Sequence, residues 1–297
     1  MTKIVDMEIG APKSGKAKEI DRIMRGRPGT PFPEPLDRPE GYGFDNYGKI
    51  FGGGAGTSEA KVGPTLSDLV GEMDAAGVEF GLLTGVPNDE IGQVHRDFPN
   101  RFQIFAWIDP RDGMRGVREL ERLVREEGAT GLRVSSLYNN LAASDRRYYP
   151  LYAKCCELEI PIRVYTAMTY ANDRPYELGH PRHLDMIAVD FPELRIIAGL
   201  AGWPWVGDMV ALLRRHPKLY CDTAAHRPRH FGTPGSGWEQ FLQFGNTLLQ
   251  DKVMTGFSRY LFNCPYEELI AEYRALPLKE HVLEKWLYGN AARFFGE

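Results

Sequence analysis

From residue 65 to the end of the chain, short apolar runs alternate with amphipathic stretches, and this alternation constrains the fold more than any other feature. The apolar runs have the length of strands, whereas the stretches between them carry apolar residues at helical spacing. Over residues 65–76, for example, Leu66, Leu69 and Met73 fall on one helical face, and Gly77 follows as a stop signal. Unbroken alternation of strands and helices predicts a parallel sheet.

Eight strands are expected, over residues 4–8, 80–84, 102–108, 131–135, 160–166, 194–200, 219–223 and 252–258. Helices are expected over residues 65–76, 90–97, 113–127, 149–158, 181–190, 205–215, 238–249, 266–275, 279–287 and 290–295. Eight strand–helix units in 297 residues predict an α/β fold, a (β/α)8 TIM barrel that forms a single domain over 1–297. A doubly wound open sheet is the alternative, but no GxGxxG motif follows the first strand to support dinucleotide binding.

Residues 10–63 interrupt the alternation. This stretch is rich in Gly and Pro, which predicts a long loop after strand 1 rather than a packed element. Its glycine run at 52–54 is not followed by Lys and Ser or Thr, so it is not a phosphate-binding P-loop. Because long loops in compact domains are often functional, we expect a loop or lid near an active site, with a floppy insertion as the alternative.

Composition limits the classes of partner. The chain has 36 Lys and Arg residues against 40 Asp and Glu residues, so its formal net charge of −4 argues against a protein devoted to nucleic acid. No apolar run reaches the ~18 residues of a membrane helix, and the first residues lack the apolar core of a secretory signal. The four Cys residues form no CxxC pair and are expected to be reduced thiols. These features predict a cytoplasmic protein without a membrane or nucleic-acid partner.

Several motifs occur in an order and spacing that is similar to the amidohydrolase 2 family of the amidohydrolase superfamily. They are FPNRF at 98–102, GLRV at 131–134, YPLY at 149–152 leading into IPI at 160–162, FPELRII at 191–197, GWPW at 202–205 and YGNAARF at 288–294. The resemblance runs from Lys3 to Phe295 and implies a (β/α)8 barrel. It also implies the chemistry of a branch that contains aromatic-acid decarboxylases, hydratases and lactonases.

The resemblance implies a divalent metal, Zn or Mn, at the C-terminal ends of the strands, but most of its ligand positions are replaced. Gly10 stands at a His position on strand 1, Tyr165 and Leu200 stand at the His positions after strands 5 and 6, and Arg259 stands where the strand 8 Asp belongs. Only Glu8 could still ligate. Since a Zn²⁺ site needs three or four N, O or S donors, we predict that no metal cofactor is bound.

The alternative is a metal site rebuilt from residues outside the family pattern. The residues available for such a site are Asp6, Glu8, Asp222 and His226.

The alternation of side chains along strands predicts what occupies the barrel instead. Asp6 and Glu8 should point inward from strand 1, and Arg259 should point inward from strand 8. Because these strands are neighbours in a closed barrel, we expect Arg259 to sit near the former metal position in a pair with Glu8. A pair that only fills the vacant position is the alternative; otherwise the site predicts a small anionic ligand, most naturally a carboxylate.

The residues predicted to bind this substrate are Arg259, Arg163, Arg133, Asp6 and Ser258. If Glu8 neutralises Arg259, then Arg133 and Arg163 become the better carboxylate-binding groups.

Proton transfer requires a titratable group near the strand ends. His226 follows strand 7, where barrel enzymes place catalytic groups, and is predicted as the general acid or base, with a solvated or structural imidazole as the alternative. Asp222 could orient it or act as a base, and Tyr165 could donate a hydrogen bond to a developing oxyanion or merely line the core. With Glu8, these residues form the predicted catalytic set.

Together these patterns predict an amidohydrolase-2-like, metal-independent enzyme that acts on a small carboxylated cyclic or aromatic substrate. The expected reaction is hydrolysis of a lactone or amide, or decarboxylation. Two alternatives remain open, namely a catalytically inactive TIM-barrel binding protein and a metal-dependent hydrolase with a rebuilt site. Aromatic residues in the loops also leave a homo-oligomer open.

Overall fold

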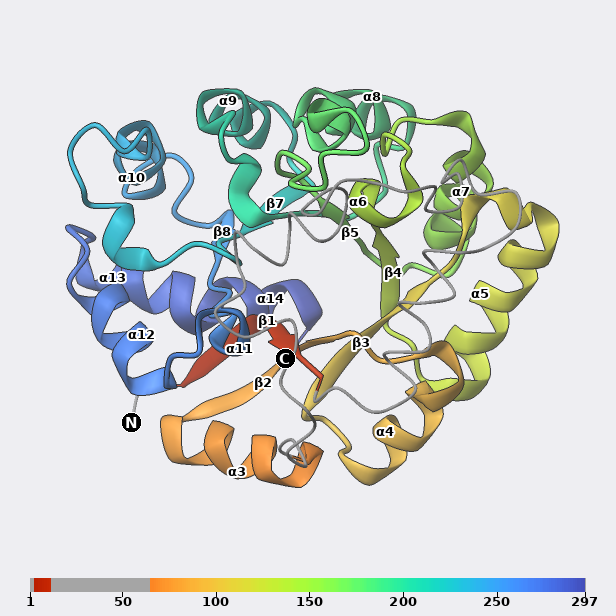
Figure 1. Ribbon diagram of the computed structural model, residues 1–297, viewed down its shortest axis with the longest axis horizontal. Coiled ribbons are helices and arrows are strands. Elements are labelled where there is room, and N and C mark those ends of the chain that lie inside the picture. Colours follow the sequence, from red (N-terminus) through yellow and green to blue (C-terminus); the bar gives the residue numbers. More distant parts are fainter. Residues whose placement is uncertain (1–2, 12–64, 297) are drawn as a thin grey trace.

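The computed structural model describes residues 3–11 and 65–296. Apart from its first two residues, the loop expected over 10–63 lies outside the described residues. The described chain forms eight parallel strands in the order β1 to β8, so the predicted (β/α)8 barrel is confirmed (Figure 1). The strands are β1 (Ile4–Gly10), β2 (Val78–Thr84), β3 (Phe102–Trp107), β4 (Gly131–Val134), β5 (Ile162–Tyr165), β6 (Ile196–Gly199), β7 (Leu219–Asp222) and β8 (Val253–Met254).

Most of the helices surround the strands on the outside of the barrel, whereas α14 lies across its centre in this view (Figure 1). The helices are α3 (Leu66–Ala76), α4 (Ile91–Asp97), α5 (Met114–Glu127), α6 (Ser136–Asn139), α7 (Tyr149–Glu157), α8 (Arg182–Asp190), α9 (Val206–Arg215), α10 (Glu239–Gly245), α11 (Arg259–Phe262), α12 (Tyr266–Arg274), α13 (Glu280–Glu284) and α14 (Asn290–Phe295). None of these helices is long and apolar enough to cross a membrane.

Two layers of apolar side chains hold the barrel together. The inner layer lies inside the ring of strands and consists of Val5, Met7, Phe80, Leu82, Phe105, Ile197 and Met254, with Ala291 and Phe294 from α14. The outer layer is larger and packs the strands against the surrounding helices. Since α14 contributes to the inner layer, it closes one end of the barrel, and the C-terminal ends of the strands remain for a site.

The barrel closes between β1 and β8 with few ladder bonds. The Met7 amide donates to the Thr255 carbonyl at 2.8 Å, but β8 contains only residues 253–254, whereas the sequence predicted a strand over 252–258. The next two amides donate to side chains instead of a neighbouring strand, because Gly256 N–H bonds to Thr223 Oγ1 at 3.2 Å and Phe257 N–H bonds to Asp6 Oδ1 at 2.9 Å. The chain therefore leaves the sheet early and turns outward.

Candidate active site at the C-terminal ends of the strands

Residues with strained backbone conformations follow three of the strands at their C-terminal ends. Leu200 after β6, Ala225 after β7 and Ser258 after β8 have φ values of 67°, 60° and 48°, in the left-handed region that costs a non-glycine residue roughly 1–2 kcal/mol. The Ala225 N–H donates to Ser258 Oγ at 2.9 Å and so links two of these turns. Strained residues of this kind are concentrated at functional sites, which directs attention to this end of the barrel.

Arg163 on β5 is the central charge of the site. Its side chain is buried, and its guanidinium donates to Asp222 through Nε at 2.7 Å and through Nη2 at 3.2 Å. Nη2 also lies 2.7 Å from Glu8 Oε2, so one guanidinium is paired with carboxylates from β1 and β7. Burial alone would lower the pKa of Arg163, but the charges of Asp222 and Glu8 outweigh it and raise the pKa above its ordinary value. The guanidinium is therefore permanently charged.

Asp222 at the end of β7 is fully buried and accepts four hydrogen bonds. Besides the two bonds from Arg163, its Oδ1 accepts the N–H groups of Leu200 at 3.1 Å and Ala224 at 3.0 Å. Three of these donors therefore reach Oδ1, and Arg163 Nε alone reaches Oδ2. The residue predicted as a base thus has a firm structural role beside Arg163, and its predicted part in catalysis remains untested.

Glu8 reaches the barrel interior through an irregularity in β1. The pairing of β1 with β2 shifts register between Asp6 and Ile9, which turns the Glu8 side chain toward Arg163. Thr84 at the end of β2 donates its hydroxyl to Glu8 Oε1 at 3.1 Å. The Glu8 side chain is 24% exposed, so it has the access to water that Asp222 lacks.

Asp6 does not lie beside Glu8, and the prediction that both point inward was wrong. Asp6 points away from the barrel toward α12, where its carboxylate accepts from the N–H groups of Glu8 and Phe257 and from the hydroxyl of Tyr266, each at 2.9 Å. Burial raises the pKa of Asp6 to about 6, and these hydrogen bonds oppose the rise only in part. The cause of the error is the irregularity in β1, which interrupts the simple alternation of side chains.

Arg259 also lies outside the barrel, so the predicted pair between Glu8 and Arg259 is wrong. Its Nη1 lies 2.5 Å from Glu72 Oε2 of α3, and its guanidinium lies over the ring of Tyr260 at 4.6 Å. The physical reason is the early end of β8: Phe257 packs outward against Tyr266, so the residues that follow belong to the outer layer. Arg259 therefore cannot supply the charge at the former metal position.

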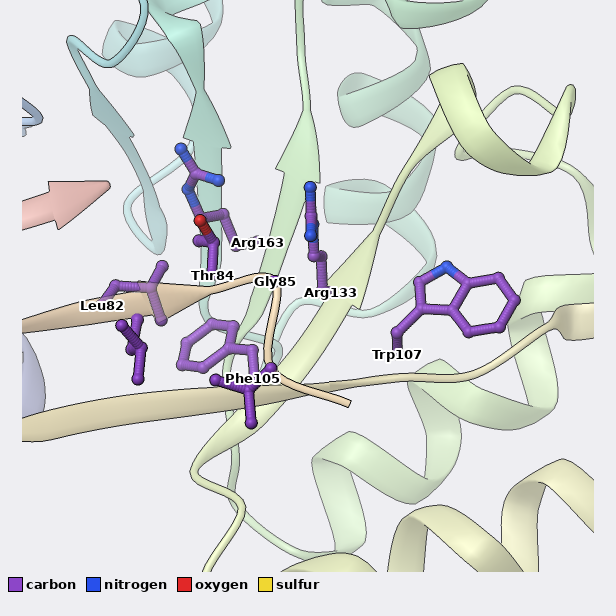
Figure 2. A pocket seen from close by; sticks show the side chains of 9 residues that line it. Leu82, Thr84, Gly85, Phe105, Trp107, Arg133 and Arg163 are labelled. Carbon is purple, nitrogen blue, oxygen red and sulfur yellow. The ribbon is translucent and has the colours of Figure 1, made fainter. Parts of the chain in front are cut away.

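A cavity opens beside Arg163 at the ends of β2 to β5. Its empty volume is ≈ 320 Å³, including space open to solvent, and its lining residues are Leu82, Leu83, Thr84, Gly85, Val86, Phe105, Trp107, Arg133 and Arg163. Figure 2 shows the guanidinium groups of Arg133 and Arg163 projecting in the same direction, with Phe105 and Leu82 beneath them. Arg133 and Arg163 are direct partners in the register of β4 and β5, so two of the predicted substrate-binding residues meet.

Arg133 differs from its neighbour because no carboxylate pairs with it among the described residues. Its guanidinium instead lies over the ring of Tyr138 at 5.4 Å. In the same cavity wall, the indole Nε1 of Trp107 is buried and has no hydrogen-bond partner within residues 3–11 and 65–296. Through Arg133 the cavity thus offers a charged hydrogen-bond donor to a ligand that carries oxygen acceptors, beside apolar side chains such as Phe105 and Leu82.

None of the four predicted catalytic residues lines this cavity; Glu8 and Asp222 contact it only through Arg163, and the other two lie further away. Tyr165 donates its hydroxyl to the Met168 carbonyl at 3.0 Å. His226 lies between two indoles, with ring centroids 6.0 Å from Trp203 and 5.0 Å from Trp238. Burial lowers the pKa of His226 to about 4, so its imidazole is neutral at pH 7 and is a poor proton donor.

The residues at this position do not fit the divalent metal that the family resemblance implies. The two carboxylates that approach one another, Glu8 and Asp222, are separated by the charged guanidinium of Arg163. Over the described part of the chain, no three His, Cys, Asp or Glu side chains gather into a group that could hold an ion. A divalent ion would have to displace a buried guanidinium from both of its partners. Of the other proposed ligands, Asp6 faces out of the barrel toward Tyr266, and the His226 ring lies against Trp203 and Trp238.

The sequence analysis missed three residues of the site, namely Thr84, Trp107 and Gly199. Gly199 ends β6, between the strands that carry Arg163 and Asp222, and a Cβ there would lie 3.1 Å from Cζ and Nη2 of Arg163. A small residue on a strand between two strands with opposite charges is a signal that could have revealed the ion pair.

Comparison with known proteins agrees with this architecture. The family model for amidohydrolases of the amidohydrolase 2 type matches residues 53–296. A 2-amino-3-carboxymuconate-6-semialdehyde decarboxylase from Dictyostelium discoideum is 24% identical over 237 residues, which cover 70% of this chain. The match spans 65% of that relative, less than two thirds of its length.

Solved structures are similar over nearly the whole chain. An uncharacterised TIM-barrel protein from Bordetella bronchiseptica has a TM-score of 0.70 at 24% identity, covering 99% of this chain and 98% of its own. A 5-carboxyvanillate decarboxylase from Novosphingobium aromaticivorans, with bound manganese and 3-methoxy-4-hydroxy-5-nitrobenzoic acid, has a TM-score of 0.68 at 15% identity and covers 100% and 97%. At these identities the solved structures show a shared fold.

Proposed function

The chain belongs to the amidohydrolase 2 family, and from this membership and its cavity we propose that it is a carboxy-lyase for a small aromatic or conjugated acid. The observation that carries the proposal is Arg133, a guanidinium without a carboxylate partner in the described residues, in a cavity walled by Phe105 and Trp107. Decarboxylation is preferred to lactone or amide hydrolysis because the curated relative is described as a decarboxylase. Hydrolysis is the second candidate.

Arg133 is the group of the cavity wall that is available to an acidic oxygen of the ligand. Glu8 and Asp222 carry two negative charges, and both lie against the single guanidinium of Arg163. Arg133 lines the cavity and has no carboxylate partner among the described residues. A planar guanidinium binds a carboxylate through two parallel hydrogen bonds and can also donate to a phenolate oxygen, which makes Arg133 the recognition group.

The chemistry decides which part of the substrate Arg133 should hold. In decarboxylation the C–C bond breaks, CO2 leaves, and the bonding pair stays on the ring carbon, which then takes up a proton. The negative charge of the departing carboxylate disappears from that group, so a cation bound to it would oppose the reaction. Arg133 is therefore assigned to an oxygen group that stays on the ring, such as a phenolate or a second carboxylate.

The incoming proton needs a side chain with access to water. Asp222 is fully buried, and His226 does not line the cavity. Glu8 is partly exposed beside Arg163, so we assign to its carboxylate the orientation of a water molecule. This water gives a proton to the ring carbon, and the hydroxide that remains combines with the released CO2 as bicarbonate.

The experiment is a turnover assay on the purified full chain. Benzoates that carry a phenolic or second carboxylate group are incubated with the protein in D2O, and CO2 release and deuterium on the product ring are both measured. Arg133→Gln is expected to raise KM about 10- to 100-fold, the effect of losing a charge-assisted hydrogen bond of roughly 1.5–3 kcal/mol. Arg133→Lys should lose less because it keeps the charge without the planar fork.

The matched control is Arg115→Gln on α5, where the arginine side chain is 77% exposed and should leave KM unchanged. Cleavage of lactones or amides without CO2 release would replace the proposed reaction with hydrolysis. Binding of the acids without any turnover would identify a binding protein. Equal KM values for Arg133→Gln and the unmutated protein would remove Arg133 from the site.

A further inference from the structure

We propose that Arg163 is the resident cation of this site, and that its guanidinium takes the place of the divalent metal that the family resemblance implies. The inference goes beyond the proposed reaction, because it concerns which cation the carboxylates hold and applies to decarboxylation, hydrolysis or binding alike.

The partners of Arg163 come from the strands that surround the centre of the barrel. Asp222 on β7 binds the guanidinium through two nitrogens, and Glu8 on β1 approaches Nη2 at 2.7 Å. Glu8 Oε2 is buried and has no well-directed hydrogen bond within the described residues, so its contact with Arg163 is mainly one of charge. A carboxylate in this state requires a cation beside it, and Arg163 is the cation that lies there.

Asp222 is already bound through both of its oxygens. Its Oδ1 accepts from Arg163 Nη2 and from the backbone N–H groups of Leu200 and Ala224, and its Oδ2 accepts from Arg163 Nε. Coordination through Oδ1 would require the loss of at least one of these bonds in a fully buried place, and Oδ2 lies against the charged guanidinium. Leu200 has a φ of 67°, in the left-handed region, and in this conformation of the turn after β6 its N–H donates to the Asp222 carboxylate.

Gly199 is explained by the space that the guanidinium occupies. Its backbone has φ −68° and ψ 147°, which any residue adopts, so no conformational reason demands glycine. A Cβ at this position would lie 3.1 Å from both Cζ and Nη2 of Arg163, and 3.2 Å from the Val164 carbonyl. These distances are too short for ordinary contact, so Gly199 is a positioning residue that leaves room for the resident cation.

The first measurement is the metal content of the full chain, purified without chelators, together with its thermal midpoint in MnCl2 and ZnCl2 titrations. We expect well below one equivalent of metal and no saturable rise of the midpoint for the unmutated protein. One tightly bound equivalent of zinc or manganese would overturn the proposal. Because this readout does not depend on turnover, it remains decisive if the proposed reaction is wrong.

The second measurement removes the resident cation. Arg163→Gln leaves Glu8 and Asp222 without a counter-charge, so Mn²⁺ should now bind about tenfold or more tightly and raise the thermal midpoint in a saturable manner. Arg133→Gln removes an equal charge without freeing either carboxylate and should gain no affinity. A folded Arg163→Gln protein that gains no affinity for Mn²⁺ would contradict the proposal.

If Arg163→Gln does not fold, Arg163→Gln/Asp222→Asn provides the test. This double variant keeps a single uncompensated carboxylate, at Glu8, and should bind Mn²⁺ more tightly than the unmutated protein. Failure to gain affinity in the folded double variant would again overturn the assignment of Arg163.

Discussion

Two buried aspartates, one on each side of the barrel wall, show how the surroundings decide what the same side chain does. Asp222 faces inward from β7 and Asp6 faces outward from β1, and both are 0% exposed. Each accepts two backbone N–H groups. They differ in their third partner, which is the guanidinium of Arg163 for Asp222 and the neutral hydroxyl of Tyr266 for Asp6.

The two aspartates differ in how their negative charge is compensated. At Asp222 the negative charge is neutralised inside the barrel, in a pair that also holds Glu8 in the site. At Asp6 dipoles alone oppose the cost of burial, and the pKa of that carboxyl rises to about 6. The guanidinium therefore ties Asp222 into the site, whereas Asp6 has no such partner and has a pKa within the working range of most proteins.

The largest effect should follow from breaking the pair at Asp222. Asp222→Asn keeps the side-chain volume but leaves a buried guanidinium facing an amide, so the free energy of unfolding should fall by about 3–5 kcal/mol. Equilibrium urea unfolding measures it. Asp251→Asn, at a carboxylate that is 52% exposed beside Lys285, is the control and should cost less than about 1 kcal/mol.

A double-mutant cycle sharpens this test. Arg163→Met combined with Asp222→Asn should be less destabilised than the sum of the two single variants, because the double variant leaves no buried guanidinium unpaired. Additive losses would mean that the two side chains do not stabilise each other.

A smaller loss of stability is expected for a substitution at Gly199, because this glycine leaves space for the ion pair of Arg163 and Asp222. Gly199→Ala should lower the free energy of unfolding by roughly 1–3 kcal/mol, because its Cβ crowds the Arg163 guanidinium. The matched control is Gly71→Ala in the middle of α3, where a Cβ meets nothing within 4 Å. That substitution should stabilise the protein by roughly 0.5–1 kcal/mol through helix propensity. A neutral result at Gly199 would show that the guanidinium can shift without loss.

Much of this architecture could be predicted from the sequence, because strand and helix periodicity is local. The spacing of apolar residues predicted the bounds of β2 to β7 and of most helices to within a few residues. The alternation of these strands and helices predicted the barrel. The same reasoning predicted Glu8, Arg163, Asp222 and Arg133 as site residues, since all stand near the ends of strands. Their catalytic and binding roles remain predictions.

What could not be predicted was the pairing, because it depends on two irregularities of the backbone. The register shift in β1 separates Asp6 from Glu8, and the early end of β8 moves Arg259 to α3. Contacts between residues far apart in the chain accompany both irregularities, such as the 2.9 Å bond from Phe257 N–H to Asp6 and the ion pair of Arg259 with Glu72. A local pattern of alternation carries no information about such contacts.

The smallest expected effect is the change with pH in the free energy of unfolding that Asp6 causes. This effect tests the aspartate that has no guanidinium partner. Its pKa is raised from 3.8 in the unfolded chain to about 6 in the folded protein, so the folded state binds the proton more tightly. The stability from this group is fully present below pH 3.8 and is lost as pH rises through about 6, with a total of about 3 kcal/mol. Between pH 5 and pH 7.5 the loss should be about 1–2 kcal/mol.

Asp6→Asn removes that dependence while it keeps the shape and most of the hydrogen bonds, since its amide oxygen can accept both backbone N–H groups. Urea unfolding of both proteins at pH 5 and pH 7.5 should therefore show Asp6→Asn gaining about 1–2 kcal/mol relative to the unmutated protein at the higher pH. Asp190→Asn, at an exposed carboxylate that accepts from Tyr149, provides the control for a general charge effect and should not change the difference. A difference that stays constant with pH would mean that Asp6 is compensated as fully as Asp222, and the contrast between the two aspartates would then lie in geometry and not in charge.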